Sequence, residues 1–170
     1  MNTFRALALT VAMLMFCLPS RASGQKASER TPSEEIEYQK KSGIAFMTKI
    51  SQREDVLTMS SGLQIQTIKV GTGQRPRPGD LVLVNYKGFL LDGRCFSEGK
   101  EVSFPVDELI EGFREGLLLM SEGGHAVIVI PCELAYGDQG TEVIPGGATL
   151  LFDVELIKVQ HKAAASPARR

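Results

Sequence analysis

The chain has 170 residues and a formal net charge of −1 at neutral pH, and 43% of its residues are hydrophobic. This length fits one domain with appendages, and the hydrophobic fraction is sufficient for a packed core. The near-zero charge, with no basic stripe along the chain, argues against a protein that binds nucleic acid.

Residues 1–22 have the pattern of a cleaved secretory signal peptide. A short basic start precedes an apolar stretch from Ala6 to Pro19, and small residues around Ala22 suit a signal peptidase. The apolar stretch is shorter than the roughly 20 residues that span a bilayer. We therefore expect a periplasmic or secreted protein. A lipoprotein anchored through Cys17 is the alternative, and it is disfavoured because bulky Phe16 precedes that cysteine.

Export makes the remaining cysteines relevant, because disulfides persist in oxidising compartments. The spacing of Cys95 and Cys132 matches neither a CxxC nor a metal-binding motif. The sequence leaves open whether they pair, since pairing requires their backbones to approach closely. His125 follows two glycines and stands alone, so we expect it at the surface.

Residues 23–60 are predicted to hold a polar leader, one helix and a linker. Thr31 is a candidate N-cap with acidic residues in the turn that follows, which predicts a helix from Ser33 to about Gln52. The apolar face of this helix is thin, so we expect it to dock on the main domain or to be exposed. Docking against a second copy of the chain is the alternative. Residues 55–61 are expected to be a linker.

Residues 61–160 are predicted to form the compact domain. Alternating and β-branched patterns predict five strands, and Asp92-Gly93 predicts a hairpin between the second and third. Polar residues 97–101 are expected to interrupt the third strand as a bulge. The expected strands are Leu63–Gln66, Leu81–Leu91, Arg94–Phe104, Ala126–Ile130 and Leu150–Leu156.

Residues 105–120 change to helical spacing, with Gly112 and Gly116 inside the helix. Each interior glycine costs about 1 kcal/mol against alanine, so we expect another element to pack closely against this helix. The order of elements predicts an α+β fold: a five-stranded antiparallel sheet wrapped around one short helix, preceded by a single N-terminal helix. Residues 161–170 are expected to be a disordered tail.

The connection between the last two strands is long and keeps its own apolar anchors, including Leu134, Tyr136 and Ile144. We interpret it as a loop that folds over a pocket and contributes side chains to it. The alternative is a loop pinned to its own core. The chain has no GxSxG, HExxH or phosphate-binding glycine motif, so we expect no cofactor, no metal and no covalent or proton-transfer catalysis.

Six motifs, in order, resemble the FKBP-type peptidyl-prolyl cis-trans isomerases. The resemblance covers roughly residues 60–159, and the lead-in around Gly43 and Gly62 is similar to the exported macrophage infectivity potentiator branch. It implies an FKBP-like fold and an isomerase that assists the folding of exported proteins. The motifs are Val84–Gly88, Leu91–Phe96, Leu109–Leu117, Leu134–Gly137, Val143–Pro145 and Ala148–Leu156.

The resemblance implies a pocket that twists an X–Pro amide in a dry, aromatic environment. Its catalytic residues would be Tyr136 and Ile110, whose hydroxyl and backbone N–H donate to substrate carbonyls, and Phe113 beneath the proline ring. The remaining substrate-binding residues would be Tyr86, Phe96, Ser97, Leu109, Ile144 and Phe152. For Tyr86, Phe152, Ile110 and Phe113, a plain role in the core is the alternative.

Three features differ from the usual family pattern. Ser97 stands where an aspartate is usual, Phe113 stands where a tryptophan is usual, and the 97–103 stretch is short. We expect a pocket that is shallower on one wall, with reduced activity. The alternative function is a catalytically weak proline-binding or chaperone module. Expected partners are proline-containing segments of unfolded or partly folded exported proteins and macrolide inhibitors, and the chain is expected to be a monomer or a weak dimer through its N-terminal helix.

Overall fold

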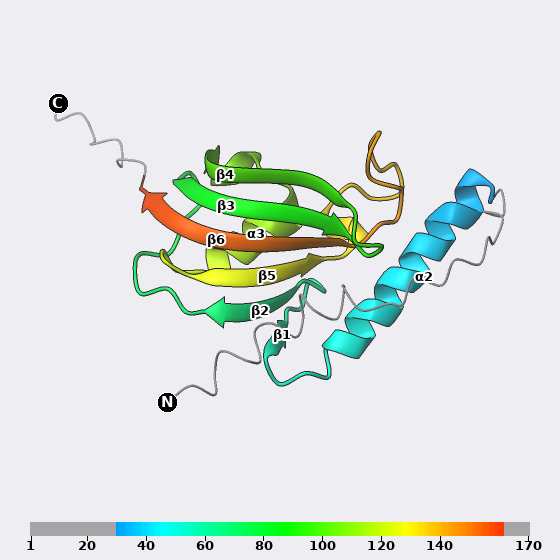
Figure 1. Ribbon diagram of the computed structural model, residues 1–170, viewed down its shortest axis with the longest axis horizontal. Coiled ribbons are helices and arrows are strands. Elements are labelled where there is room, and N and C mark those ends of the chain that lie inside the picture. The colour runs from blue at the N-terminus through cyan, green and yellow to red at the C-terminus, as the bar shows by residue number, and fades with distance from the viewer. Residues whose placement is uncertain (1–29, 162–170) are drawn as a thin grey trace, which may run out of the picture.

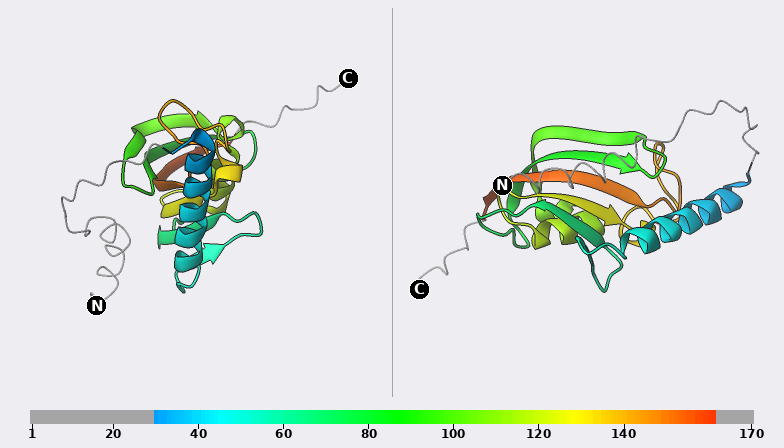
Figure 2. Two further views of the ribbon diagram at one scale, coloured as in Figure 1. Left: turned by 90° about the vertical axis from the view of Figure 1, so that its right-hand side faces the viewer. Right: turned by 60° about the horizontal axis from the view of Figure 1, so that its bottom comes forward.

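The computed structural model describes residues 30–161. The predicted signal peptide, most of the predicted leader and nearly all of the predicted tail lie outside these residues. The described part is an antiparallel sheet with a short helix on one face and a longer helix across one end (Figures 1 and 2). The α+β class expected from the sequence is confirmed.

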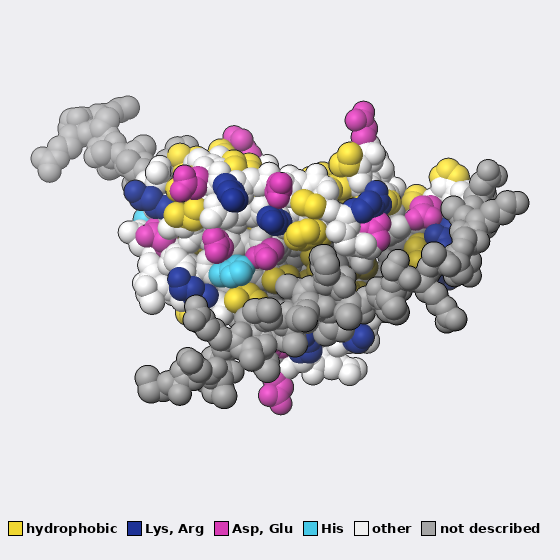
Figure 3. Space-filling view, viewed as in Figure 1, with side chains coloured by type: hydrophobic (Ala, Val, Ile, Leu, Met, Phe, Trp, Pro, Cys, Tyr) yellow, Lys and Arg dark blue, Asp and Glu magenta, His cyan; other side chains and the backbone are white. Residues whose placement is uncertain are grey.

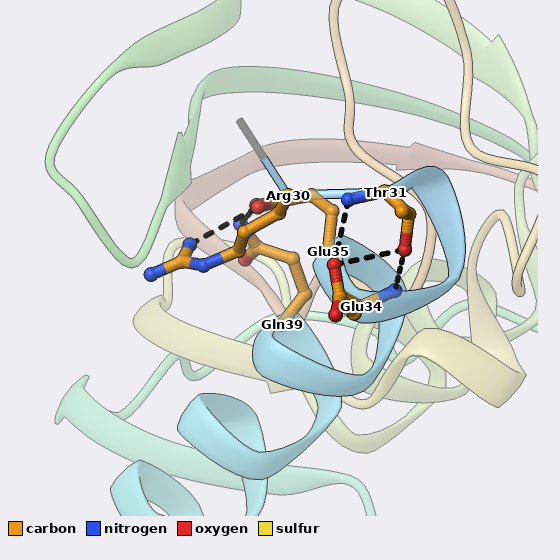
Figure 4. A network of polar contacts seen from close by, with 5 residues as sticks. All are labelled: Arg30, Thr31, Glu34, Glu35 and Gln39. Carbon is orange, nitrogen blue, oxygen red and sulfur yellow. Dashed lines mark hydrogen bonds and ion pairs between the residues drawn. The ribbon is translucent and has the colours of Figure 1, made fainter. Parts of the chain in front are cut away.

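The longer helix, α2, spans Pro32–Ile50 and begins where the sequence predicts. Thr31 is its N-cap: its hydroxyl accepts a hydrogen bond from the Glu34 N–H, and the Glu34 carboxylate accepts one from the Thr31 N–H. Figure 4 shows this capping box with a second chain of contacts, from Arg30 and Gln39 to Glu35. A reciprocal cap satisfies two otherwise unpaired N–H groups, which fixes the start of the helix.

The sheet has six strands, in the order β1-β2-β5-β6-β3-β4, and every neighbouring pair is antiparallel. The expectation of five strands was wrong by one, because part of the predicted linker forms the edge strand β1 against β2. Only three residues pair there, which is too short for a recognisable alternation in the sequence. The strands are β1 Val56–Thr58, β2 Gln64–Lys69, β3 Leu81–Leu90, β4 Cys95–Pro105, β5 His125–Ile130 and β6 Leu150–Gln160.

The predicted bulge lies in β4 without breaking the strand. Val84 pairs with Val102 and Tyr86 with Gly99, so β4 has one extra residue between these pairs. Glu101 has φ of 51°, and the Asn85 side chain on β3 accepts a hydrogen bond from its N–H. A side chain from the partner strand thus satisfies an N–H that the bulge removes from the ladder.

The predicted helix at residues 105–120 is shorter in the structure and divided. Val106–Glu108 form a 3-10 turn, η1, and the α-helix α3 spans Glu111–Leu119 with Ile110 as its N-cap. α3 lies against the inner face of the sheet, where a Cβ on Gly112 would be 2.3 Å from Ile130 Cγ2. The two glycines therefore allow the close approach that the sequence predicted. The core between α3 and the sheet contains Val84, Leu117, Ile128, Leu150, Val154 and Leu156.

The outer face of the sheet is divided between α2 and solvent. At the α2 end, Phe46 and Ile50 line a narrow crevice with Val127, Val129 and Leu151. Away from α2 the exposed strands carry interspersed acidic and basic side chains (Figure 3). The predicted docking of this helix on its own domain is thus observed.

Candidate functional site

A hollow of about 330 Å³ lies between α3 and the inner face of the sheet, at the end covered by the β5–β6 loop. This volume is at the lower end of the range for small-molecule sites. The residues that line it are Tyr86, Phe96, Ser97, Phe104, Glu108, Leu109, Ile110, Phe113, Tyr136, Thr141, Val143, Ile144 and Phe152.

All nine site residues expected from the sequence line this one hollow. Tyr86 comes from β3, Phe96 and Ser97 from β4, and Phe152 from β6. The start of α3 and the residues just before it contribute Leu109, Ile110 and Phe113. The loop contributes Tyr136 and Ile144, so it folds over a pocket as expected. Their roles toward a substrate stay predictions.

The sequence analysis missed four lining residues, which are Phe104, Glu108, Thr141 and Val143. Phe104 lies in a predicted strand and Val143 in a loop motif of the resemblance. Their apolar side chains were the signal that could have placed them in the pocket. Glu108 and Thr141 carried no such signal, because both are exposed polar residues in segments whose path only the fold defines.

The floor of the hollow is an aromatic cluster. The Phe113 and Phe152 rings stack with centroids 4.6 Å apart and planes at 27°. Phe96 meets Phe152 edge to face at 5.5 Å, and Tyr86 lies 6.2 Å from Phe113. Such offset and edge contacts hold the rings in fixed orientations, which gives a rigid apolar surface.

Few polar groups face this surface. The Tyr86 hydroxyl and the Ser97 hydroxyl share a hydrogen bond of 3.0 Å. Among the described residues, neither the Tyr136 hydroxyl nor the Ile110 N–H has a hydrogen-bond partner. Ile110 is the N-cap of α3, so its N–H lies outside the helix and is free to donate to a ligand.

The loop that carries Tyr136 and Ile144 is held by its own hydrogen bonds. The Thr141 hydroxyl accepts from the N–H groups of Val143 and Ile144, and Gly147 N–H donates to the Gly137 carbonyl. Cys132, in the 3-10 turn η2 (Cys132–Leu134) that opens the loop, is buried, which raises its thiol pKa to about 11. The loop is therefore a structured cover rather than a solvated linker.

Helix α2 supports this loop from outside the hollow. Lys40 forms an ion pair with Asp138, and Ile36 packs against the Gly146-Gly147 turn. A Cβ on Gly147 would lie 2.7 Å from the Ile36 carbonyl oxygen. The helix thus fixes the outer side of the segment whose inner side faces the hollow.

Other candidates from the sequence have ordinary structural roles. Cys95 and Cys132 are free thiols, Cys95 exposed and Cys132 buried, so the open question of a disulfide is answered in the negative for the described residues. His125 is partly exposed rather than fully at the surface, and it pairs with Asp153. Within residues 30–161, no three His, Cys, Asp or Glu side chains gather as a metal site would require. No helix in that range has the length and apolar character needed to cross a bilayer.

Comparisons with known proteins agree with this geometry. The family model described as FKBP-type peptidyl-prolyl cis-trans isomerase matches residues 72–157. FkpA of Escherichia coli K12 is 43% identical over 131 residues, which are 74% of this chain and 48% of that protein. The Mip isomerase of Coxiella burnetii is 38% identical, over 69% of this chain and 54% of its own.

The solved structure of E. coli FkpA has a similar fold. The TM-score is 0.74 at 39% identity, and the match covers 76% of this chain and 62% of the FkpA chain. The chain spans about half the length of the curated relatives reported above.

Proposed function

This chain belongs to the FKBP-type peptidyl-prolyl cis-trans isomerase family, and we propose that it catalyses the cis–trans isomerisation of X–Pro peptide bonds. The observation that carries the proposal is the meeting of Tyr136, Ile110 and Phe113 in one aromatic hollow. The proline ring lies on the stacked Phe113 and Phe152 rings, and Ile144 and Val143 close over it.

The hollow favours the twisted amide over the planar one. Rotation about an X–Pro bond has a barrier of about 18–20 kcal/mol because amide resonance is lost at the twist. The twisted amide is less dipolar than the planar amide, so it loses less favourable hydration when it leaves water for an apolar surface. The apolar hollow therefore raises the free energy of the planar ground state more than that of the twisted transition state. This effect requires no proton transfer and no group that changes charge.

Two donors orient the peptide. The Tyr136 hydroxyl and the Ile110 N–H, both without an intramolecular partner in the described chain, donate to the carbonyls that flank the proline. Holding one side of the X–Pro bond while the other turns lowers the entropic cost of reaching the twist.

The Tyr86–Ser97 hydrogen bond replaces a charged contact on one wall. Ser97 keeps the Tyr86 hydroxyl oriented at 3.0 Å, but a neutral serine polarises it less than a carboxylate would. This difference supports an enzyme of moderate rather than high rate.

The test is an isomerisation assay on a capped X–Pro tetrapeptide, followed by NMR exchange at micromolar protein. Wild type is expected to accelerate exchange. Tyr136→Phe removes one hydrogen bond to the substrate and is expected to lower kcat/KM about three- to tenfold. Folding of the variant is checked by its unfolding midpoint.

Thr58→Val is the matched control, because it removes a hydroxyl from an exposed site in the edge strand β1. It is expected to leave kcat/KM unchanged. Folded wild type without acceleration would contradict catalysis, and peptide binding in that sample would favour a proline-binding or chaperone module instead.

The proposal extends to location and clients. Residues 1–22 have the composition of a cleaved signal peptide, which supports a periplasmic or secreted protein. Its substrates are then proline-containing segments of exported proteins during folding, where uncatalysed isomerisation takes tens to hundreds of seconds. Macrolide inhibitors would occupy the same hollow, and self-association would be at most weak.

A further inference from the structure

A second concavity, of about 530 Å³, lies between α2 and the turn that joins β3 to β4. We call it the α2 groove. One wall is a single face of α2, since its residues recur at helical spacing, and the other wall comes from the β3–β4 turn and Pro145. The lining residues are Glu35, Tyr38, Gln39, Ser42, Phe46, Leu90, Leu91, Asp92, Arg94 and Pro145.

This face of α2 borders the face that docks on the domain, and Phe46 belongs to both, since it also lines the crevice with Val127 and Val129. Ile36, Gly43 and Met47 contact the domain: Ile36 at the loop, Gly43 beside Thr149, and the Met47 carbonyl through Gln64. Tyr38, Ser42 and Phe46 lie one step around the helix and line the groove. The helix therefore has one face that is covered by its own domain and an adjacent face that remains accessible, with Tyr38 47% exposed.

The groove adjoins the candidate substrate site along the chain, although no described residue lines both. Ile144 lines the hollow and its neighbour Pro145 lines the groove. On β4, Phe96 and Ser97 line the hollow, and Arg94 at the start of the hairpin return lines the groove. A client chain with its proline in the hollow would pass the edge of this loop to enter the groove.

The dimensions and chemistry of the groove fit an extended polypeptide. Its α2 wall runs from Glu35 to Phe46, which are eleven helical steps of about 1.5 Å, or about 16 Å in all. This length accommodates about five extended residues. Tyr38, Phe46 and Leu91 offer apolar contacts, and the Ser42 hydroxyl is available to the backbone. The charged side chains balance, because Arg94 pairs with Asp92 and Glu35 with Arg30.

We propose that the α2 groove is an extended subsite that binds the client segment flanking the proline held in the hollow, and that it prefers aromatic and aliphatic side chains. The proposal rests on the proposed isomerase function. The groove would raise the affinity for long unfolded chains over short peptides, so its effect appears mainly in KM.

The experiment compares two peptides with the same X–Pro centre: a capped tetrapeptide and a peptide of about twelve residues with apolar flanks. Wild type is expected to show kcat/KM about tenfold higher on the long peptide, through a lower KM, as one to two buried apolar contacts would give. Ser42→Arg, which fills the groove, is expected to reduce this long-to-short ratio to about one.

The matched control is Ile44→Arg, which introduces the same side chain at a position 67% exposed on the opposite side of α2. It is expected to keep the tenfold ratio. An unchanged ratio in Ser42→Arg, or an equal loss in both variants, would overturn the subsite.

The outcomes separate this proposal from the proposed function. If folded wild type fails on the tetrapeptide, isomerase activity is rejected, and fluorescence anisotropy of the labelled long peptide then tests the groove alone. Light scattering tests the other occupants: association that Ser42→Arg abolishes would assign the groove to a second copy. A chain that starts at Arg30 tests the remaining occupant. If Ser42→Arg no longer changes the long-to-short ratio of kcat/KM in that shorter chain, the groove would be assigned to residues before Arg30. Either result would overturn the peptide subsite.

Discussion

His125 and Asp153 face each other across β5 and β6 on the outer face of the sheet. The hydrogen bond to Asp153 is the main cause of a raised His125 pKa, and burial opposes it. Glu155 also raises the pKa, and Lys69 on β2 lowers it. A raised folded-state pKa means that the protonated pair stabilises the fold fully below the ordinary His pKa of 6.5, and that this stability is lost as pH rises through the folded value.

We therefore expect His125→Gln to lower the free energy of unfolding at pH 5.5 by at most about 1 kcal/mol, since the pair is partly exposed. The difference between variant and wild type should shrink above pH 8. Urea unfolding at several pH values measures it. His161, which pairs with Asp80, is present in both proteins and cancels in the difference. A difference that grows with pH would contradict the assignment.

Two residues of the hollow, Ser97 and Phe113, shape its chemistry without adding charge. Ser97 orients the Tyr86 hydroxyl without adding charge, and Phe113 provides an apolar floor without a ring N–H. The Phe113 ring stacks on Phe152, so the floor of the hollow is an apolar aromatic surface.

At the scale of elements, the contact between α3 and the sheet decides the geometry of the floor. Cβ atoms built on Gly112 and Gly116 would lie 2.3 and 2.6 Å from the side chains of Ile130 and Ile128, well inside van der Waals distance. The helix lies this close because both positions lack side chains. Phe113, between them in sequence, is held at the base of the hollow as a result.

Gly112→Ala tests this close packing. Alanine gains about 1 kcal/mol in helix propensity, but overpacking costs about 1–3 kcal/mol, so we expect a net loss of about 1 kcal/mol. Urea unfolding of Gly112→Ala measures the loss, and Glu111→Ala, exposed on the same helix, is the control. A stabilised Gly112→Ala would show that the sheet moves away without cost.

At the scale of the whole molecule, α2 acts as part of the domain rather than as an appendage. Its first half supports the substrate-facing loop through Ile36 and Lys40, and its second half covers Val129 and Leu151 on the outer face. This coverage explains why β5 is apolar on both faces: α3 covers one and α2 covers the other.

We expect a chain that starts at Arg53 to be less stable than one that starts at Arg30 by about 3 kcal/mol, because Phe46 and Ile50 no longer cover the sheet. Both chains should unfold in one transition, which differential scanning calorimetry measures. Two separate transitions in the longer chain would show that α2 is not part of the cooperative unit.

Local chemistry made four features predictable from the sequence: the capped start of α2 at Thr31, the Asp92-Gly93 hairpin, the alternating strands and the glycine spacing of α3. The six motifs of the sequence also identified the family and nine residues of the hollow, since motif residues keep their spacing along the chain. The short edge strand β1 depends on tertiary structure, because its three residues pair with the free edge of β2, whose other edge pairs with β5. The α2 groove likewise depends on how α2 crosses the end of the sheet, which follows from packing half-buried Ile36 and Met47 and buried Gly43 against the domain. Such an arrangement joins residues far apart in sequence, and no local pattern encodes it.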